Sequence, residues 1–191
     1  MKHVSGLILR LMGWSVDVSP ELRLKKAVVI MAPHTSSSDF WIGRLAYWML
    51  GMKVNFFIKK EMFFFPLGFF IRAMGGISVN RQKSGNLKDE IVRMFSEKEN
   101  FVLTITPEGT RKLNHNWKRG FYYIATKADV PILFGYIDYK KKIGGIGKQI
   151  NPSGDFEKDM EIIQAFYADI TARYPENFNL SPENRKNKEL L

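Results

Sequence analysis

His34 and Asp39 are the two side chains whose types and spacing best suit acid–base chemistry. His34 follows an apolar, β-branched run at 27–31 that is typical of a buried strand, and residues 40–52 have the apolar spacing of a helix. The hydroxyl residues at 35–38 favour a turn and a helix N-cap, so we expect Asp39 to begin the helix. At such a turn the carboxylate can hold the imidazole in one tautomer and orientation, as a general base requires.

The chain offers this base no nucleophile of its own. It contains no G-x-S-x-G elbow and no cysteine. A base at His34 would therefore activate a hydroxyl that arrives with the substrate. The alternative is a structural one, in which a turn histidine with satisfied hydrogen bonds precedes a capped helix, and the spacing alone leaves both interpretations open.

Composition limits the classes of protein to consider. The 191 residues, 45% hydrophobic and 25% charged, suit one domain with a sizeable core. The absence of cysteine excludes a disulfide framework and a thiolate metal site, and it is compatible with a reducing cytoplasm. Three histidines without H-x-x-x-H spacing disfavour a metal hydrolase, and we expect no metal. The net charge of +10 favours anionic partners such as phosphates, coenzyme A, acyl carrier protein, anionic lipid or nucleic acid.

Two terminal segments flank the expected domain at residues 25–174. Residues 1–24 contain an amphipathic helix that either packs on the domain or lies in a membrane surface. It is too short to cross a bilayer and lacks a signal-peptide cleavage pattern. The polar tail at 175–191 is expected to be loosely ordered. The apolar face of the N-terminal helix consists of Val4, Leu7, Ile8, Leu11 and Trp14.

An apolar run with five phenylalanines occupies residues 62–71. Ten residues are too few to cross a bilayer, which takes about 20. Pro66 and Gly68 disfavour a long regular element here. We expect the run to lie mainly in the core with partial exposure, and the alternatives are a slot for an alkyl chain or a contact with a membrane.

Strands and helices alternate from residue 27 to residue 137, which predicts an α/β fold: a single layered domain with a largely parallel central sheet flanked by helices. His34, Lys59, Arg81 and the segment Glu108–Arg111 each follow a strand. Ligands of such sheets bind beyond the carboxyl ends of the strands, so we expect these polar groups to meet at one edge. The remaining elements are a basic hairpin or loop at 140–147 and a helix at 156–174. The strands are expected at 27–31, 54–58, 77–79, 101–105 and 131–137.

The polar clusters also carry a family resemblance. Taken in order, they resemble the four sequence blocks of the glycerolipid acyltransferases, the family of lysophosphatidic acid acyltransferases. The H-x4-D pattern is common by itself, but its order and distance relative to E-G-T-R make the match specific. The blocks are His34-x-Ser36-x-x-Asp39, Gly76–Arg81, Pro107–Arg111 and Val130–Ile132, with Lys59, Pro66-x-Gly68 and Lys118-x-Gly120 similar to further blocks, over residues 27–135.

The resemblance implies a fold like that of glycerol-3-phosphate acyltransferase and transfer of a fatty acyl group, in phospholipid biosynthesis, from an acyl-CoA or acyl carrier protein thioester. The acceptor would be a hydroxyl of a lysophospholipid, in the first place lysophosphatidate. His34 would act as general base oriented by Asp39, and backbone N–H groups near Gly75 or Gly109 would stabilise the oxyanion. The resemblance implies that the acceptor phosphate is bound by Lys59, Arg81, Glu108, Gly109, Thr110 and Arg111.

The same resemblance implies a place in the cell. It predicts a protein held peripherally on the cytoplasmic face of the inner membrane, which uses no metal or organic cofactor and binds no nucleic acid. Pro33 and Thr106 stand where many family members have asparagine and phenylalanine, and Ser37 and Ser38 replace a bulkier pair. These departures leave open the acceptor, including an amino-acid lysolipid, and the mode of membrane attachment. The rival interpretation is a non-catalytic basic module that binds anionic membranes or nucleic acid, which would not need His34.

Overall fold

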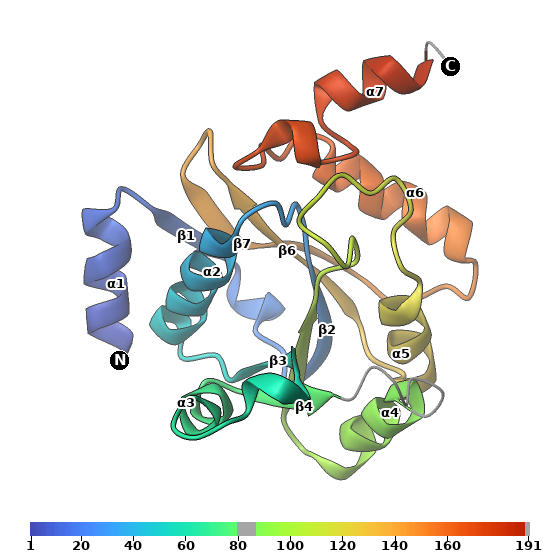
Figure 1. Cartoon of the computed structure of the whole chain (residues 1–191). Coiled ribbons are helices and arrows are strands. Elements are labelled where there is room, and N and C mark those ends of the chain that lie inside the picture. Colours follow the sequence, from blue (N-terminus) through green and yellow to red (C-terminus); the bar gives the residue numbers. More distant parts are fainter. Residues whose placement is uncertain (80–86, 190–191) are drawn as a thin grey trace.

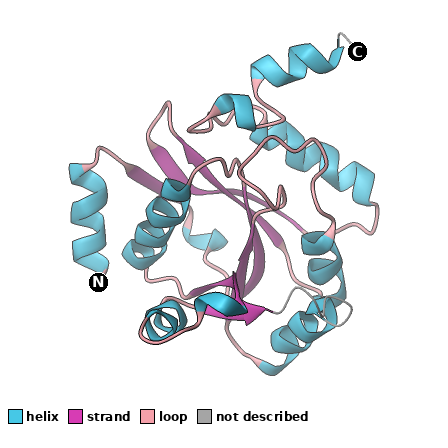
Figure 2. Ribbon diagram, in the orientation of Figure 1, coloured by secondary structure: helices cyan, strands magenta, loops and turns pink. Residues whose placement is uncertain are grey.

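The computed structural model describes residues 1–79 and 87–189, and the side chains up to 185 in the last helix. A twisted sheet runs through the middle of the domain, with helices on both of its faces (Figures 1 and 2). The strands are β1 (Ser15–Val18), β2 (Lys26–Met31), β3 (Val54–Lys59), β4 (Gly76–Val79), β5 (Phe101–Ile105), β6 (Ile132–Asp138) and β7 (Ile143–Ile150). The helices are α1 (Lys2–Leu11), α2 (Ser37–Leu50), α3 (Leu67–Ala73), α4 (Leu87–Glu97), α5 (Gly120–Ala128), α6 (Phe156–Tyr167) and α7 (Pro182–Glu189).

The sheet has seven strands in the order β1-β7-β6-β2-β5-β3-β4. Every neighbouring pair is parallel except β6 and β7, which are antiparallel. The predicted α/β domain with a largely parallel sheet is therefore confirmed. β2 lies at the centre, and residues 27–30 are fully buried because helices cover both faces, which explains an apolar run without alternation.

Successive residues of β2 point to opposite faces of the sheet. Val28 and Ile30 pack in a core cluster with α4, α5 and α6, whereas Val29 and Met31 pack in a second cluster with α1 and α2. The apolar stripe of α4 fits the first cluster, where the ring of Phe95 contacts that of Phe101 at a centroid distance of 4.7 Å. The helix α2, which follows the histidine turn, is thereby fixed against the sheet.

Two strands extend the sheet beyond the five that were expected. Residues 1–24 were assigned to an N-terminal helix, but α1 ends at Leu11 and β1 joins the sheet edge. Residues 140–147 were expected to form a basic hairpin or loop, and the hairpin is what the structure shows, with the glycine-rich part in strand β7 paired to β6. A Cβ atom on Gly145 would lie 1.8 Å from the carbonyl oxygen of Asp17, so glycine is what allows β1 to pair here.

The tail after residue 174 is better packed than its composition predicted. Phe178 is fully buried in the core cluster, and the indole Nε1 of Trp117 donates a hydrogen bond of 3.0 Å to Asn179 Oδ1. The prediction of a loosely ordered tail is therefore wrong for residues 175–181, because one aromatic side chain anchors a polar segment. The preceding helix α6 is also shorter than predicted, since it ends at Tyr167.

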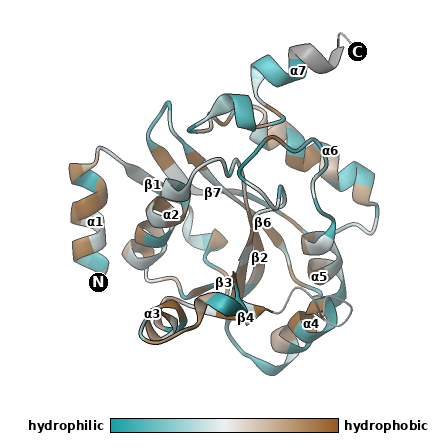
Figure 3. Ribbon diagram, viewed as in Figure 1, coloured by the Kyte–Doolittle hydropathy of each residue, from teal (hydrophilic) through white to brown (hydrophobic). Residues whose placement is uncertain are grey.

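The largest exposed apolar surfaces belong to α1 and to the phenylalanine run. Leu9 of α1 is buried against the domain, and Trp14, which lies beyond the end of α1, is buried in the second core cluster. The other four residues of the predicted apolar face are exposed, with Leu11 at 79%. The phenylalanine run was expected to lie mainly in the core with partial exposure, but most of it is exposed, and Phe65 is 92% exposed. Figure 3 shows both α1 and α3 as hydrophobic elements on the outside of the domain. Within the described residues no helix is both long and apolar enough to span a membrane.

Candidate active site

The turn between β2 and α2 binds the Asp39 carboxylate from several sides. Ser36 is the N-cap of α2, and Asp39 is the third helical residue and completes a capping box, so it does not begin the helix as predicted. Asp39 is 3% exposed, and its Oδ2 atom accepts hydrogen bonds from the backbone N–H groups of Thr35 (2.9 Å) and Ser36 (2.8 Å). The short polar residues Thr35 and Ser36, which follow β2, therefore hold the Asp39 carboxylate next to His34.

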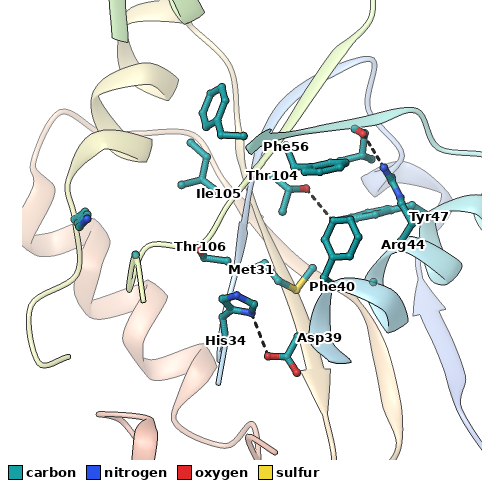
Figure 4. A pocket seen from close by; sticks show the side chains of 15 residues that line it. Met31, His34, Asp39, Phe40, Arg44, Tyr47, Phe56, Thr104, Ile105 and Thr106 are labelled. Carbon is teal, nitrogen blue, oxygen red and sulfur yellow. Dashed lines mark hydrogen bonds and ion pairs between the residues drawn. The ribbon is translucent and has the colours of Figure 1, made fainter. Parts of the chain in front are cut away.

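His34 contacts this carboxylate through one ring nitrogen. Its Nδ1 atom lies 3.1 Å from Asp39 Oδ2. When the imidazole is neutral and Nδ1 is the donor, Nε2 is unprotonated and can accept a proton. Figure 4 shows the His34 ring and the Asp39 carboxylate next to each other at one end of the residues that line a cavity. The predicted pairing of the two side chains is present, and it holds the imidazole in one orientation.

Glu108 holds the backbone of the same turn. Its side chain is buried, and its carboxyl oxygens accept the N–H group of His34 at 2.9 and 3.3 Å. Burial raises the pKa of Glu108, the hydrogen bond from His34 lowers it, and the neighbouring charge of Asp39 raises it, so that the net pKa is about 8. Glu108 therefore contacts the turn that carries His34 and helps to fix the backbone of that residue.

The cavity next to His34 has a volume of about 390 Å³ and lies between α2, β3 and β5. His34 and Asp39 are at one end, and Arg44 and Tyr47 are at the other (Figure 4). Most of its walls are apolar, as in pockets that bury a hydrophobic ligand. The apolar lining residues are Met31, Phe40, Val54, Phe56, Phe57 and Ile105.

Arg44 closes the far end of this cavity. It is 4% exposed, its Nη1 atom donates to the carbonyl oxygens of Val54 (3.2 Å) and Met74, and its guanidinium lies 5.5 Å from the ring centroid of Phe56. Burial lowers the pKa of Arg44. The Arg44 side chain connects α2 to the start of β3 and to the residue after α3. Because it is held at this place, it forms the closed end of the cavity.

A second, polar depression lies beside the first turn of α2 and has a volume of about 590 Å³. Arg111 donates to the hydroxyl of Ser37, and Arg173 donates to the hydroxyl of Ser38. Guanidinium groups together with a helix N-terminus favour the binding of an anion. The residues that line it are Thr35, Ser36, Ser37, Ser38, Thr110, Arg111, Lys112, Arg173 and Tyr174.

The predicted site residues divide between these two cavities. Gly109 lines the apolar cavity, and the next residues, Thr110 and Arg111, line the polar depression. Lys59 is exposed at the end of β3 and is not among the residues that line either cavity. Arg81 lies outside the described residues. The two strand-end segments at 34–35 and 108–111 do meet, as expected from the parallel sheet.

The predicted oxyanion donors already have partners. The N–H group of Gly109 donates to the carbonyl of Thr106 at 3.1 Å, and that of Gly75 donates to Arg72 at 2.9 Å. Lys118 instead lines the cavity, and its side chain packs so closely on Gly109 that a Cβ atom there would lie 2.8 Å from Nζ. The pattern Lys118-x-Gly120 was the sequence signal for this residue.

Two further residues near the turn come from the C-terminal part of the chain. Tyr139 follows β6 and contacts Asp39, and Arg173 follows α6 and lines the polar depression. Neither residue lies in a recognisable motif or within the span of the family resemblance. Only the pairing of β6 with the central strand brings this part of the chain to the site, so local sequence carried no signal for it.

Comparisons with known proteins agree with this arrangement. The sequence profile of the family described as Acyltransferase matches residues 15–134. Human 1-acyl-sn-glycerol-3-phosphate acyltransferase beta is 30% identical over 129 residues, which cover 63% of this chain and 45% of the human protein. The chain therefore spans less than half the length of this curated relative.

A solved structure shares the fold. The crystal structure of the 1-acyl-sn-glycerophosphate (LPA) acyltransferase PlsC from Thermotoga maritima has a TM-score of 0.63, at 16% sequence identity. The similarity covers 99% of this chain and 77% of that chain. The fold class and the resemblance inferred from the sequence blocks are both confirmed.

Proposed function

Because the chain belongs to the Acyltransferase family, we propose that it transfers a fatty acyl group from a thioester to a hydroxyl of a lysophospholipid, with lysophosphatidate as the first acceptor to test. The observation that carries this proposal is the contact of His34 Nδ1 with Asp39 at the end of an apolar cavity. An oriented base next to a slot for an alkyl chain is what acyl transfer to an alcohol requires. A non-catalytic module would have no need of this pair.

In the proposed reaction, His34 Nε2 removes the proton from the acceptor hydroxyl while its oxygen attacks the thioester carbonyl carbon. Proton transfer by a positioned side chain is typically worth a factor of about 10² to 10⁴ in rate. The tetrahedral intermediate then expels the thiolate of coenzyme A or acyl carrier protein, and the imidazolium returns its proton to the sulfur. The thioester already carries the activated acyl group, so the proposed transfer needs no metal or organic cofactor.

Lys118 is the proposed partner of the oxyanion. It lines the same cavity as His34, and the positive charge of its ammonium group suits an oxygen that becomes negative in the transition state. The adjacent Gly109 has a φ of +69° and no side chain, which allows this close approach. A Cβ atom at this position would push Lys118 away from its place.

The acceptor phosphate is proposed to bind in the polar depression. Arg111 and Arg173 both line it and can donate to phosphate oxygens. The depression adjoins the cavity where Gly109 is followed by Thr110, so a glycerol backbone there would bring its hydroxyl toward His34. Lys59 and Arg81 remain proposed contributors of positive charge.

We also propose peripheral attachment to a membrane, at the cytoplasmic face of the inner membrane, through α1 and residues 62–70. Both segments expose apolar side chains, and the net charge of +10 favours anionic lipid. Phe65→Ser should weaken binding to phosphatidylglycerol vesicles in a sedimentation assay, and unchanged binding would contradict the attachment. The exposed residues are Val4, Leu7, Leu11, Phe64, Phe65, Phe69 and Phe70.

The experiment that tests the proposed function is identification of the product by mass. Purified protein is incubated with acyl-CoA or acyl carrier protein thioesters and a panel of acceptors: lysophosphatidate, glycerol phosphate and an amino-acid lysolipid. The proposal expects one acceptor to gain the acyl mass in the presence of a thioester. Hydrolysis of the thioester without acyl gain by any acceptor would contradict it.

A further inference from the structure

Tyr139 joins the site from the turn between β6 and β7. Its hydroxyl donates a hydrogen bond of 2.6 Å to Asp39 Oδ1, whereas Oδ2 is the atom that faces His34. The two oxygens of the carboxylate are therefore held from opposite sides. Tyr139 lies five residues beyond the end of the matched family region at residue 134.

We propose that Tyr139 is a positioning residue for the general base and acts on His34 through Asp39. This role rests on the proposed function, because it concerns the same base. The tyrosine hydroxyl fixes the rotation of the carboxylate about its side chain, and the carboxylate in turn fixes the imidazole. A hydrogen bond to a charged group is a strong one, so its loss should loosen this alignment.

The surroundings of Tyr139 keep its hydroxyl in place as a donor. Its backbone N–H donates to the carbonyl of Thr171 at 2.9 Å, and its ring packs edge-on against Trp14 at 5.1 Å. The guanidinium of Arg173 lies 5.9 Å from the ring centroid. Burial and the contact with Asp39 raise the pKa of Tyr139, so the hydroxyl retains its proton over the range in which imidazole titrates.

Removal of the Tyr139 hydroxyl should also change the electrostatic interaction between Asp39 and His34. Asp39 would keep its negative charge with one donor fewer, and its attraction for a protonated His34 would increase. The midpoint of the imidazole titration should therefore move to higher pH. Among the described residues, Asp39 contacts the imidazole and Glu108 the backbone N–H of His34, and the other ionisable groups that line the same cavity are Arg44, Tyr47 and Lys118. Tyr139 acts on the imidazole through Asp39, and Arg173 lies over the ring of Tyr139.

Tyr139→Phe tests the proposal, because phenylalanine keeps the ring contact with Trp14 and removes only the oxygen. We expect kcat to fall by about 10-fold, with both KM values within about twofold of wild type. The acid limb of the kcat/KM profile should move to higher pH. Tyr136→Phe is the matched control: Tyr136 lies on β6, three residues before Tyr139, and its ring packs on Phe166. This variant should match wild type in kcat and in the pH profile of kcat/KM.

A readout without turnover separates this proposal from the proposed function. The chain has three histidines, so the imidazole signal of His34 can be assigned by NMR with His3→Gln and His115→Gln variants. A higher titration midpoint in Tyr139→Phe supports the role even if no acyl acceptor is found. An unchanged titration midpoint of His34 in Tyr139→Phe overturns the positioning role. This holds whether kcat is unchanged or falls together with the thermal unfolding temperature.

Discussion

The apolar cavity and the polar depression share a wall but have opposite character. The cavity is lined by aromatic and aliphatic side chains between α2 and the sheet, whereas the depression is lined by hydroxyl and cationic side chains outside the first turn of α2. Residues 34–35 and 109–110 pass from one to the other. Under the proposed function, the cavity would hold the alkyl chain and the depression the charged headgroup, with His34 between them.

Narrowing the apolar cavity should lower kcat/KM for long acyl thioesters, and this is the largest effect that we expect from a change in only one of the two cavities. In Thr104→Phe, a ring replaces a small side chain in the lining, so a long acyl thioester should lose roughly 10- to 100-fold in kcat/KM. A short thioester should be affected little. Thr126→Phe, on the exposed side of α5, is the matched control. Steady-state kinetics with thioesters of several lengths measure the effect, and equal losses for all lengths would mean that the cavity does not hold the acyl chain.

Removing a cationic side chain from the polar depression should instead weaken the binding of the acceptor. Arg111→Ala should raise the KM for a phosphorylated acceptor by about 10-fold, because a charge-assisted hydrogen bond is lost, and leave the thioester KM within about twofold. Arg119→Ala, which removes an exposed arginine paired with Glu157, should leave both values near wild type. If the acceptor KM and kcat stay unchanged in Arg111→Ala, the depression is not the phosphate site.

Glu108, which binds the backbone of His34 between the two cavities, should make the free energy of unfolding depend on pH, and this effect is smaller. Burial raises the pKa of Glu108 from 4.5 to about 8, so the folded protein holds this proton more tightly than the unfolded chain. The resulting stabilisation is fully present below pH 4.5 and is lost as the pH rises toward 8. Glutamine stays neutral, so Glu108→Gln should remove this pH dependence, which is on the order of a few kcal/mol, from the free energy of unfolding.

Urea denaturation of both proteins across this pH range provides the measurement. Wild type should lose stability relative to Glu108→Gln as the pH rises. The same pH dependence in the two proteins would show that Glu108 does not titrate as its burial implies. Asp155→Asn, at the exposed N-cap of α6, is a control for a carboxyl group far from the wall.

The sequence was sufficient for the parts of the site that are local in the chain. His34 and Asp39 are joined by one turn, and apolar runs identified the central strands, so the fold class and the pair followed from spacing. The sequence left the segment of β7 open between a hairpin and a loop, because Gly144, Gly145 and Gly147 are poor strand formers and pairing on both sides overrides their propensity. Its turn places Tyr139, so that contact was not predictable either.

Exposure was the least predictable property. The apolar stripe of α1 and the phenylalanine run have the periodicity or density of core segments, but both face outward. Hydrophobic spacing reports that a face is apolar and does not report what covers it. Likewise, the buried anchor Phe178 sits in a polar tail whose composition predicted disorder.

The central claim is that His34 is the base that activates the acceptor hydroxyl, and His34→Ala tests it most directly. The rate of acyl transfer, followed by the mass of the acylated acceptor, should fall by at least about 10². The circular dichroism spectrum and vesicle binding should match wild type. Transfer at a rate near that of wild type by a folded His34→Ala protein would contradict the account.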